Sequence, residues 1–283
     1  MNGILPLWKE RGMTSHDCVF KLRKILKTKK VGHTGTLDPG VEGVLPICIG
    51  QATRIAEYLT DAGKTYEAVV AIGRTTTTED AEGETVEQDT TNKSFTRTQI
   101  VQALKTLTGD IQQTPPMFSA VKVNGKKLYE YARAGQTVER PTRQVTIYEL
   151  ELLSEEENFE GQDVYFSIRI KCSKGTYIRT LAVQIGEALG YPAHMHELVR
   201  TASGTFSKEN CLTLAQVAEK VEQQDTSFIL PVEYALSDYP YVEIDDSNRK
   251  QIFNGQVLPI HPLLKVNEKL VFGVEGKAFA VYI

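Results

Sequence analysis

The sequence lacks any long apolar segment. No stretch of the 283 residues approaches the roughly 20 consecutive apolar residues that a membrane-spanning helix needs. The apolar run in the N-terminal MNGILPLWKERG is also too short for a secretory signal peptide. At 41% hydrophobic residues the chain can still bury a substantial core. These features predict a soluble globular protein of the cytoplasm with no membrane partner.

Cysteine pairs and clustered metal ligands are scarce too. The four cysteines, Cys18, Cys48, Cys172 and Cys211, are far apart, form no CxxC pair and lie among apolar residues, which favours buried free thiols over zinc ligands. The segment His194-Met195-His196-Glu197 superficially resembles a metal cluster. At the end of a helix, however, its two histidines would point in different directions, and no further ligand is evident. We therefore expect no metal site.

The chain also lacks the positive net charge that is usual in proteins that bind nucleic acids. Its formal net charge is −4. Basic residues nevertheless crowd segments 9–30 and 122–143, whereas acidic residues crowd 79–89, 151–163 and 219–246. This segregation predicts one basic face and an acidic back. The alternative is that each basic cluster is a solvated helix face that binds nothing.

The first hundred residues alternate helices and strands around one unusual loop. Residues 15–27 favour a helix that Ser15 can cap, with an apolar face opposite a basic one. Residues 32–43 form a loop rich in Gly, Thr and Pro. The other elements predicted here are strand 44–49, helix 53–60, strand 65–72 and a helix from the capping box Thr96 to Gln99 up to Gly109.

Residues 112–143 form an excursion typical of a binding element, with a Pro115-Pro116 break, a turn at Asn124-Gly125 and a short helix that carries two tyrosines. After it, apolar residues alternate along 145–153 and 164–172, which predicts a pair of antiparallel strands. The remaining predicted elements are helix 176–189 ended by Gly190, helix 214–221, strand 241–244, helix 246–253 and a hairpin over 270–283 that turns at Glu275-Gly276.

These elements predict an α+β (mixed α/β) fold. Its main domain, residues 1–236, would hold a largely antiparallel mixed sheet with flanking helices, interrupted by the insertion at 112–143. A pattern change near Ser237 marks a small β-rich C-terminal domain at 237–283, which is too short to form a strong core alone and should pack on the main body.

The loop with the most unusual composition places a single acid, Asp38, among glycines and turn formers directly before a buried strand. Catalytic groups are often held in such places. A structural aspartate that accepts hydrogen bonds from its own loop is the commoner explanation of such a pattern. Spacing alone leaves both open.

The run GHTGTLDPGVEGVLPICIG around Asp38 closely resembles the catalytic motif of the TruB-type bacterial tRNA pseudouridine-55 synthases. Other segments match the same family in order: KERGMTS at 9–15, TYEA at 65–68, the insertion segment QTPPMFSA at 113–120 and KGTYIRTL at 174–181. Two features depart from the family. Glu10 replaces the usual proline of the opening motif, and the C-terminal part is shorter than a complete PUA RNA-binding domain.

The resemblance implies isomerisation of uridine to pseudouridine at position 55 of the tRNA T-loop. Asp38 would be the covalent nucleophile, which splits a difficult exchange into two easier steps without a cofactor. Attack on ribose C1′ and addition to C6 of the base remain alternative routes. Because burial favours the neutral acid, Asp38 needs a cation beside it, and Arg179 is the matching family position.

The resemblance also assigns the pocket that would hold the flipped uridine. Tyr66 would stack on the uracil and help to remove the C5 proton, Tyr177 would form another wall, and Leu198 would form an apolar floor. His33 would fill the space that the uridine leaves in the RNA loop, without transferring a proton. On pattern alone, core residues are the commoner explanation of Tyr66, Tyr177 and Leu198.

The partner implied is the T-arm of tRNA, bound by a monomer. RNA contacts are expected from basic side chains that position without reading sequence. These are Lys9, Lys24, Lys27, Lys30, Arg140 and Arg143.

Two other classes of function are alternatives. A tRNA-folding factor could use the same basic surface, and this role could coexist with catalysis; a pure binder, however, has no use for a carboxylate that repels phosphates. An aspartyl phosphotransferase would need a second carboxylate to hold magnesium, and the loop after Asp38 offers only Glu42.

Overall fold

The computed structural model describes the backbone of residues 1–283 and every side chain except those of Asp246 and Ser247. One nine-stranded sheet runs through the main body, and its strand pairs are antiparallel except for β3 with β14. The predicted mixed, largely antiparallel sheet is therefore confirmed. In spatial order its strands are β1 (Gly3–Lys9), β3 (Glu42–Ile49), β14 (Ala193–Ser203), β4 (Lys64–Ile72), β13 (Val164–Cys172), β11 (Arg143–Leu152) and β8 (Gly109–Gln113), with β2 (Val31–His33) beside β3 and β15 (Phe206–Ser207) beside β14.

The central strands form because apolar residues recur at every second position. On β13, Val164, Phe166, Ile168 and Ile170 are buried while the residues between them face outward. The antiparallel register places Ile170 opposite Tyr66 on β4. Period-two burial on both strands therefore directs Tyr66 to the same buried side of the sheet.

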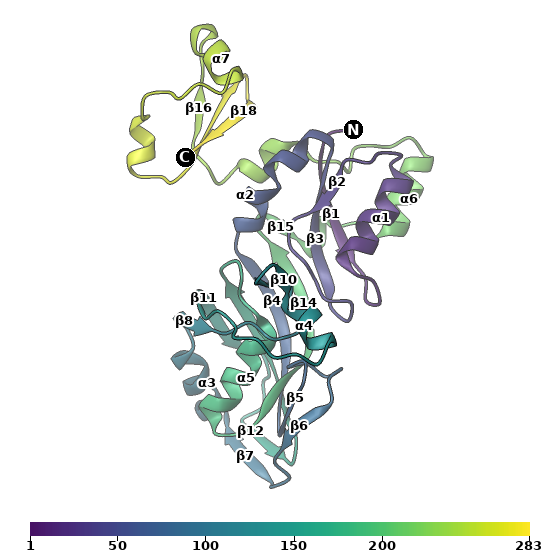
Figure 1. The fold of residues 1–283 in the computed structure, drawn as a ribbon, viewed down its shortest axis with the longest axis vertical. Helices are drawn as coiled ribbons and strands as arrows, with labels where there is room; N and C mark the ends of the chain where they lie inside the picture. The colour runs from purple at the N-terminus through teal and green to yellow at the C-terminus, as the bar shows by residue number, and fades with distance from the viewer.

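Two groups of helices flank the sheet (Figure 1). Helix α1 (Ser15–Ile25) packs beside α6 (Leu214–Glu222), and α3 (Arg97–Thr106) packs beside α5 (Ile178–Leu189). The apolar face of α5 is buried, which stabilises the fold by roughly 1.5–3 kcal/mol for each large side chain. Gly190 ends α5 in the left-handed conformation, at φ 82°. The predicted capping box of α3 is present, but Thr14, and not Ser15, caps α1.

Some predicted elements differ in the structure. The helix expected at 53–60 is a 3₁₀ turn, η1 (Gly50–Ile55), followed by a short α2 (Ala56–Asp61). The segment from His194 to Glu197 lies inside β14, not at the end of a helix. Neither β1 nor β14 was expected, because Pro6 and several charged residues mask their buried positions.

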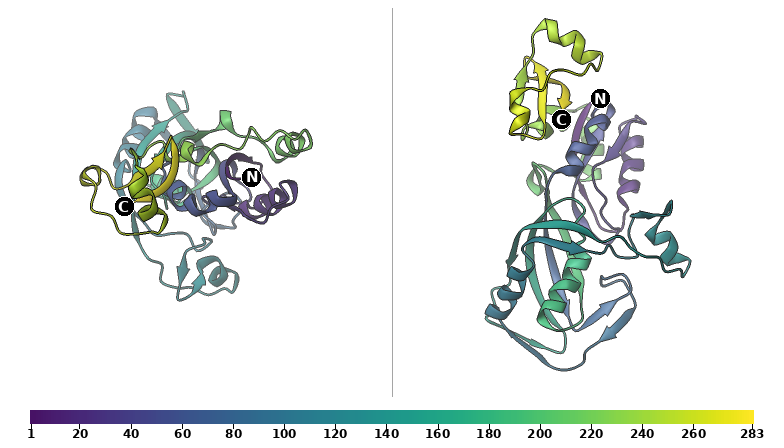
Figure 2. Two further views of the ribbon diagram at one scale, coloured as in Figure 1. Left: turned by 90° about the horizontal axis from the view of Figure 1, so that it is seen from above. Right: turned by 60° about the vertical axis from the view of Figure 1, so that its left-hand side comes forward.

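The insertion projects from the body (Figure 2). It contains the hairpin β9 (Lys122–Val123) and β10 (Lys126–Lys127), which turns at Asn124-Gly125, and helix α4 (Leu128–Arg133). Two further small sheets pair β5 (Arg74–Thr76) with β6 (Thr85–Gln88) and β7 (Lys93–Thr96) with β12 (Asn158–Gly161).

The C-terminal residues form a separate three-stranded sheet of β16 (Tyr241–Glu243), β17 (Leu270–Val274) and β18 (Lys277–Tyr282), with α7 (Asp246–Phe253) beside it. A small apolar cluster that includes Leu270 and Phe272 forms its core. Lys269 pairs with Asp61 on the main body at 3.3 Å. This arrangement supports a boundary near Ser237, which stays a prediction.

The short 3₁₀ turns of the chain's last third are η2 (Lys208–Asn210), η3 (Val232–Leu236) and η4 (Pro262–Lys265).

Cys18, Cys48 and Cys172 are buried free thiols, whereas Cys211 is only partly buried. Across the described part of the chain, no helix is both long enough and apolar enough to cross a membrane.

Candidate active site

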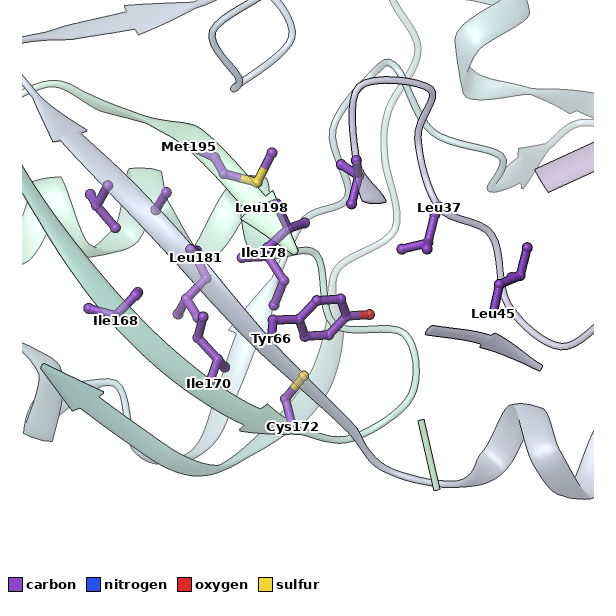
Figure 3. Close-up of a cluster of buried hydrophobic side chains, with 14 of the residues drawn as sticks. Leu37, Leu45, Tyr66, Ile168, Ile170, Cys172, Ile178, Leu181, Met195 and Leu198 are labelled. Atoms are coloured by element: carbon purple, nitrogen blue, oxygen red, sulfur yellow. The ribbon is translucent and has the colours of Figure 1, made fainter. Parts of the chain in front are cut away.

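A cavity of about 410 Å³ opens where the loop after β2, strand β4, the insertion and the start of α5 meet. Figure 3 shows the ring of Tyr66 extending from β4 toward the loop that carries Leu37, with Leu198 and Ile178 nearby. The side chains at the cavity wall that bear on its chemistry are Asp38, Lys64, Tyr66, Lys174, Tyr177, Arg179, Leu198 and Arg200.

Asp38 lies in the loop between β2 and β3, in a turn closed by the hydrogen bond from the Val41 N–H to the Asp38 carbonyl at 3.1 Å. Its side chain is 47% exposed and lines the cavity. The site of the free protein is therefore open to solvent at the carboxylate. Exclusion of water from the reacting atoms would have to come from the bound substrate.

Arg179 brings three remote segments together at the carboxylate. Its guanidinium lies 3.1 Å from Asp38 and donates hydrogen bonds to the carbonyl oxygens of Thr78 at 3.0 Å and Phe118 at 2.9 Å. Asp80 lies 3.8 Å away on the other side. The Arg179 residue is only 7% exposed. With its planar fork occupied on several sides, the guanidinium is fixed in orientation and its charge faces Asp38.

The acidic segment 79–89 does not lie wholly on an acidic back, as its charge suggested. Asp80 approaches Arg179, and the Glu79 carboxylate accepts a hydrogen bond from Thr180, the residue after Arg179, at 2.7 Å. Burial raises the pKa of Glu79. The start of this segment therefore belongs to the site.

The structure brings Tyr66, Tyr177 and Leu198 to the same cavity as Asp38. Tyr66 is buried, and this burial raises the pKa of its hydroxyl. Tyr177 directly precedes α5, and its backbone N–H donates to the Gln113 side chain at 2.9 Å. Leu198 on β14 is 9% exposed, opposite Ala68 of β4. The cavity thus has aromatic and aliphatic walls suited to a planar base.

Lys9 is not placed where the sequence predicts. It is fully buried, with 0% of its surface exposed, so it cannot be the expected RNA contact in this conformation. Its ammonium donates to the carbonyls of Glu10 at 3.0 Å and Pro39 at 3.4 Å, and burial lowers its pKa. The Gly12 N–H also donates to Pro39, at 2.9 Å. The opening segment therefore supports the Asp38 loop, although Glu10 stands in place of proline.

His33 lies on β2, outside the cavity wall. Within the described structure its Nδ1 is buried without a hydrogen-bond partner, and burial lowers the pKa of the ring. Burial therefore favours the neutral imidazole, which is consistent with the expected packing role.

The expected RNA-contacting cations are in two places. Lys24, Lys27 and Lys30 are exposed on and after α1, and the Lys24 ammonium lies 4.4 Å from the centre of the Phe20 ring. Arg140 and Arg143 are partly buried where the insertion returns to β11, and Arg140 donates to the Pro115 carbonyl at 3.0 Å. The two groups could engage different parts of a large ligand.

Two cationic residues of the cavity wall, Lys64 and Arg200, were missed by the sequence analysis. Arg200 is 1% exposed, and its guanidinium donates hydrogen bonds to the carbonyl oxygens of Val44 at 2.7 Å and Gly35 at 3.3 Å. Lys64 is 7% exposed, and burial lowers its pKa to about 8. A signal was available, since each lies two positions from a predicted pocket residue on the same strand.

The described residues include no group of three or more His, Cys, Asp and Glu side chains that could hold a metal ion. His194 and His196 extend from β14 with their ring centres 6.3 Å apart.

Comparison with known families gives two adjoining matches. Residues 23–178 match the TruB family pseudouridylate synthase (N terminal domain), and residues 179–237 match the tRNA pseudouridylate synthase B C-terminal domain.

Whole-chain relatives give the same result. A tRNA pseudouridine synthase B from Listeria innocua is 61% identical over 259 residues, which are 92% of this chain and 85% of that protein. One from Geobacillus thermodenitrificans is 55% identical over 286 residues, covering 100% of this chain and 95% of that protein.

Among solved structures, a chain of a Cbf5-Nop10-Gar1 complex superposes with a TM-score of 0.73 at 32% identity, covering 99% of this chain and 77% of that chain. A chain of an H/ACA RNP bound to a substrate RNA containing 2′-deoxyuridine gives 0.71 at 29% identity, with 99% and 77% covered.

Proposed function

The chain belongs to the TruB family of pseudouridylate synthases, and we propose that it converts the uridine at position 55, in the T-loop of tRNA, with Asp38 as the covalent nucleophile. Membership makes it an enzyme that isomerises uridine to pseudouridine in tRNA. The observation that carries the finer proposal is the pairing of Asp38 with Arg179 at the wall of a cavity that also holds Tyr66.

In the route through the sugar, a bond forms from an Asp38 carboxylate oxygen to ribose C1′ as the C1′–N1 bond breaks, and the electron pair of that bond goes to N1 of the uracil. After the base turns, C5 attacks C1′ and the carboxylate leaves. Loss of the C5 proton and protonation of N1 complete an exchange without redox change or net use of water. Addition of Asp38 to C6 is the alternative route.

Residues of this chain supply each requirement of that exchange. Arg179 orients the carboxylate, and the buried Tyr66 stacks on the base while its hydroxyl helps to remove the C5 proton. Tyr177 and Leu198 confine the base while it is detached, and His33 fills the space vacated in the RNA loop. The exposed Lys24, Lys27 and Lys30, together with Arg140 and Arg143, hold the RNA backbone.

The test is release of tritium from tRNA transcripts that carry 5-tritiated uridine. We expect the wild type to release tritium from these transcripts when position 55 is uridine, and to release none when cytidine replaces that uridine. Asp38→Asn should abolish release while tRNA affinity stays within about twofold, because the amide is nearly isosteric but a poor nucleophile. Full turnover by Asp38→Asn would remove Asp38 from the mechanism. Binding without any wild-type turnover would leave only a tRNA-folding role.

A further inference from the structure

Ser15 contacts the backbone immediately before Asp38. This first residue of α1 is 1% exposed, and its hydroxyl accepts a hydrogen bond from the Leu37 N–H at 2.9 Å and donates one to the Leu37 carbonyl at 3.2 Å. The Leu37 carbonyl belongs to the peptide bond that joins Leu37 to Asp38. One hydroxyl therefore fixes the peptide groups on both sides of Leu37. Ser15 is not among the residues at the cavity wall, so it does not meet a ligand there.

Arg200 holds the two ends of the same loop. Its Nε–H donates to the Val44 carbonyl at 2.7 Å, and its terminal NH₂ donates to the Gly35 carbonyl at 3.3 Å. On β14 it stands opposite Tyr66 of β4 on one side and pairs with Gly43 of β3 on the other. Gly43, at φ 136°, has no room for a side chain, because a Cβ there would lie 2.3 Å from the Arg200 carbonyl oxygen. Arg200 thus links the loop to the strand that carries Leu198.

The direction of the Asp38 side chain depends on this backbone as well as on the ion pair with Arg179. The carboxylate is half-exposed, and packing on the side chain alone does not determine its direction. A displacement of about 1 Å at a reacting group can lower a rate by about 100-fold. Groups that fix residues 35–44 therefore control how often Asp38 meets its target atom.

We propose that Ser15 and Arg200 act together as positioning residues, a loop clamp that keeps Asp38 aimed at the flipped uridine. The proposal rests on the function proposed above. It predicts that loss of either side chain slows the chemical step more than it weakens tRNA affinity, and that loss of Ser15, which unlike Arg200 does not line the cavity, leaves the affinity unchanged.

Ser15→Ala removes one hydroxyl and little volume, so it is the primary test. Its matched control is Ser154→Ala. The Ser154 hydroxyl likewise accepts a hydrogen bond from a backbone N–H, that of Ser167 at 2.8 Å, but Ser154 does not line the cavity. Single-turnover tritium release at saturating tRNA, the tRNA dissociation constant and the melting temperature are measured for each. We expect Ser15→Ala to be roughly 10- to 100-fold slower than the wild type, with its dissociation constant within twofold. Ser154→Ala should keep the wild-type rate.

Arg200→Lys tests the other half of the clamp, because lysine keeps the charge but lacks the fork that spans Gly35 and Val44. The single-turnover rate should again fall by at least about 10-fold, and by a larger factor than the tRNA affinity, because Arg200 also lines the cavity. In the double variant the two losses should be less than multiplicative, since both act through one loop.

A Ser15→Ala rate equal to that of Ser154→Ala would overturn the clamp, as would a rate loss matched by an equal loss of tRNA affinity. If Arg200→Lys fails to fold, the Ser15 pair alone decides. A wild type that binds tRNA but releases no tritium would count against the proposed function and not against the clamp.

Discussion

The guanidinium of Arg179 lies 3.1 Å from the carboxylate of Asp38, and its hydrogen bond to the Phe118 carbonyl also ties this pair to the insertion. The charge beside the proposed nucleophile is therefore held by the segment that would grip the RNA. Placement of the insertion on its ligand and placement of the carboxylate are linked through one side chain.

Replacement of this arginine by lysine tests that arrangement. Arg179→Lys keeps a positive charge near Asp38 but cannot bond Thr78, Phe118 and Asp38 together. We expect the single-turnover rate to fall by at least about 100-fold while the tRNA dissociation constant changes less than threefold. Lys105→Arg, a matched exchange at an exposed site on α3, is the control and should have no effect. A near-normal rate for Arg179→Lys would show that charge alone suffices.

Tyr66→Phe separates stacking from proton transfer, because it keeps the ring and removes the hydroxyl. If the hydroxyl helps to remove the C5 proton, the variant should bind tRNA normally and turn over about 100-fold more slowly. A deuterium isotope effect at C5 should also become visible, since proton removal would then limit the rate. An unchanged rate without an isotope effect would give that proton to another group.

The sequence predicted the local features of the fold and much of the candidate site. The alternation on β13 and the capping box of α3 depend on neighbouring residues, so a single sequence contains them. The resemblance selected Asp38 and Arg179, which the fold brings together. Their separation of 3.1 Å arises from long-range packing that no local pattern encodes.

The misses have physical causes. A lysine is rarely fully buried, so the sequence favoured an exposed Lys9 over one whose ammonium bonds loop carbonyls. Arg200 was missed because the charged residues of β14 disguised a buried strand. Asp80 was counted among back-face acids because its approach to Arg179 depends on how a distant loop folds over α5.

The basic surface on α1 gives a prediction about RNA affinity. Reversal of Lys24, Lys27 and Lys30 to glutamate should weaken tRNA binding and flatten the dependence of log Kd on log salt concentration, because fewer counterions are released. Binding is measured between about 50 and 200 mM salt, the range in which contacts to phosphates make affinity fall steeply with salt. Two single reversals form a matched pair: Lys24→Glu should weaken tRNA binding, whereas Lys105→Glu on α3 should not. Equal salt slopes for the triple variant and the wild type would mean that this surface faces away from tRNA.

Lys64 gives a prediction about the pH dependence of stability. Burial lowers its pKa from 10.5 to about 8, so between these values the unfolded chain binds more protons than the folded one, and stability rises with pH. The cost of burying the ammonium is fully present below about pH 8 and fades toward pH 10.5. Lys64→Met lacks this titration, while the other groups are common to both proteins. The free energy of unfolding in urea should therefore rise for the wild type relative to Lys64→Met by about 1–3 kcal/mol between pH 7.5 and pH 10. A difference that stays constant across this range would mean that Lys64 has the same pKa in the folded and unfolded states. Burial of its ammonium in the cavity wall would then not destabilise the fold.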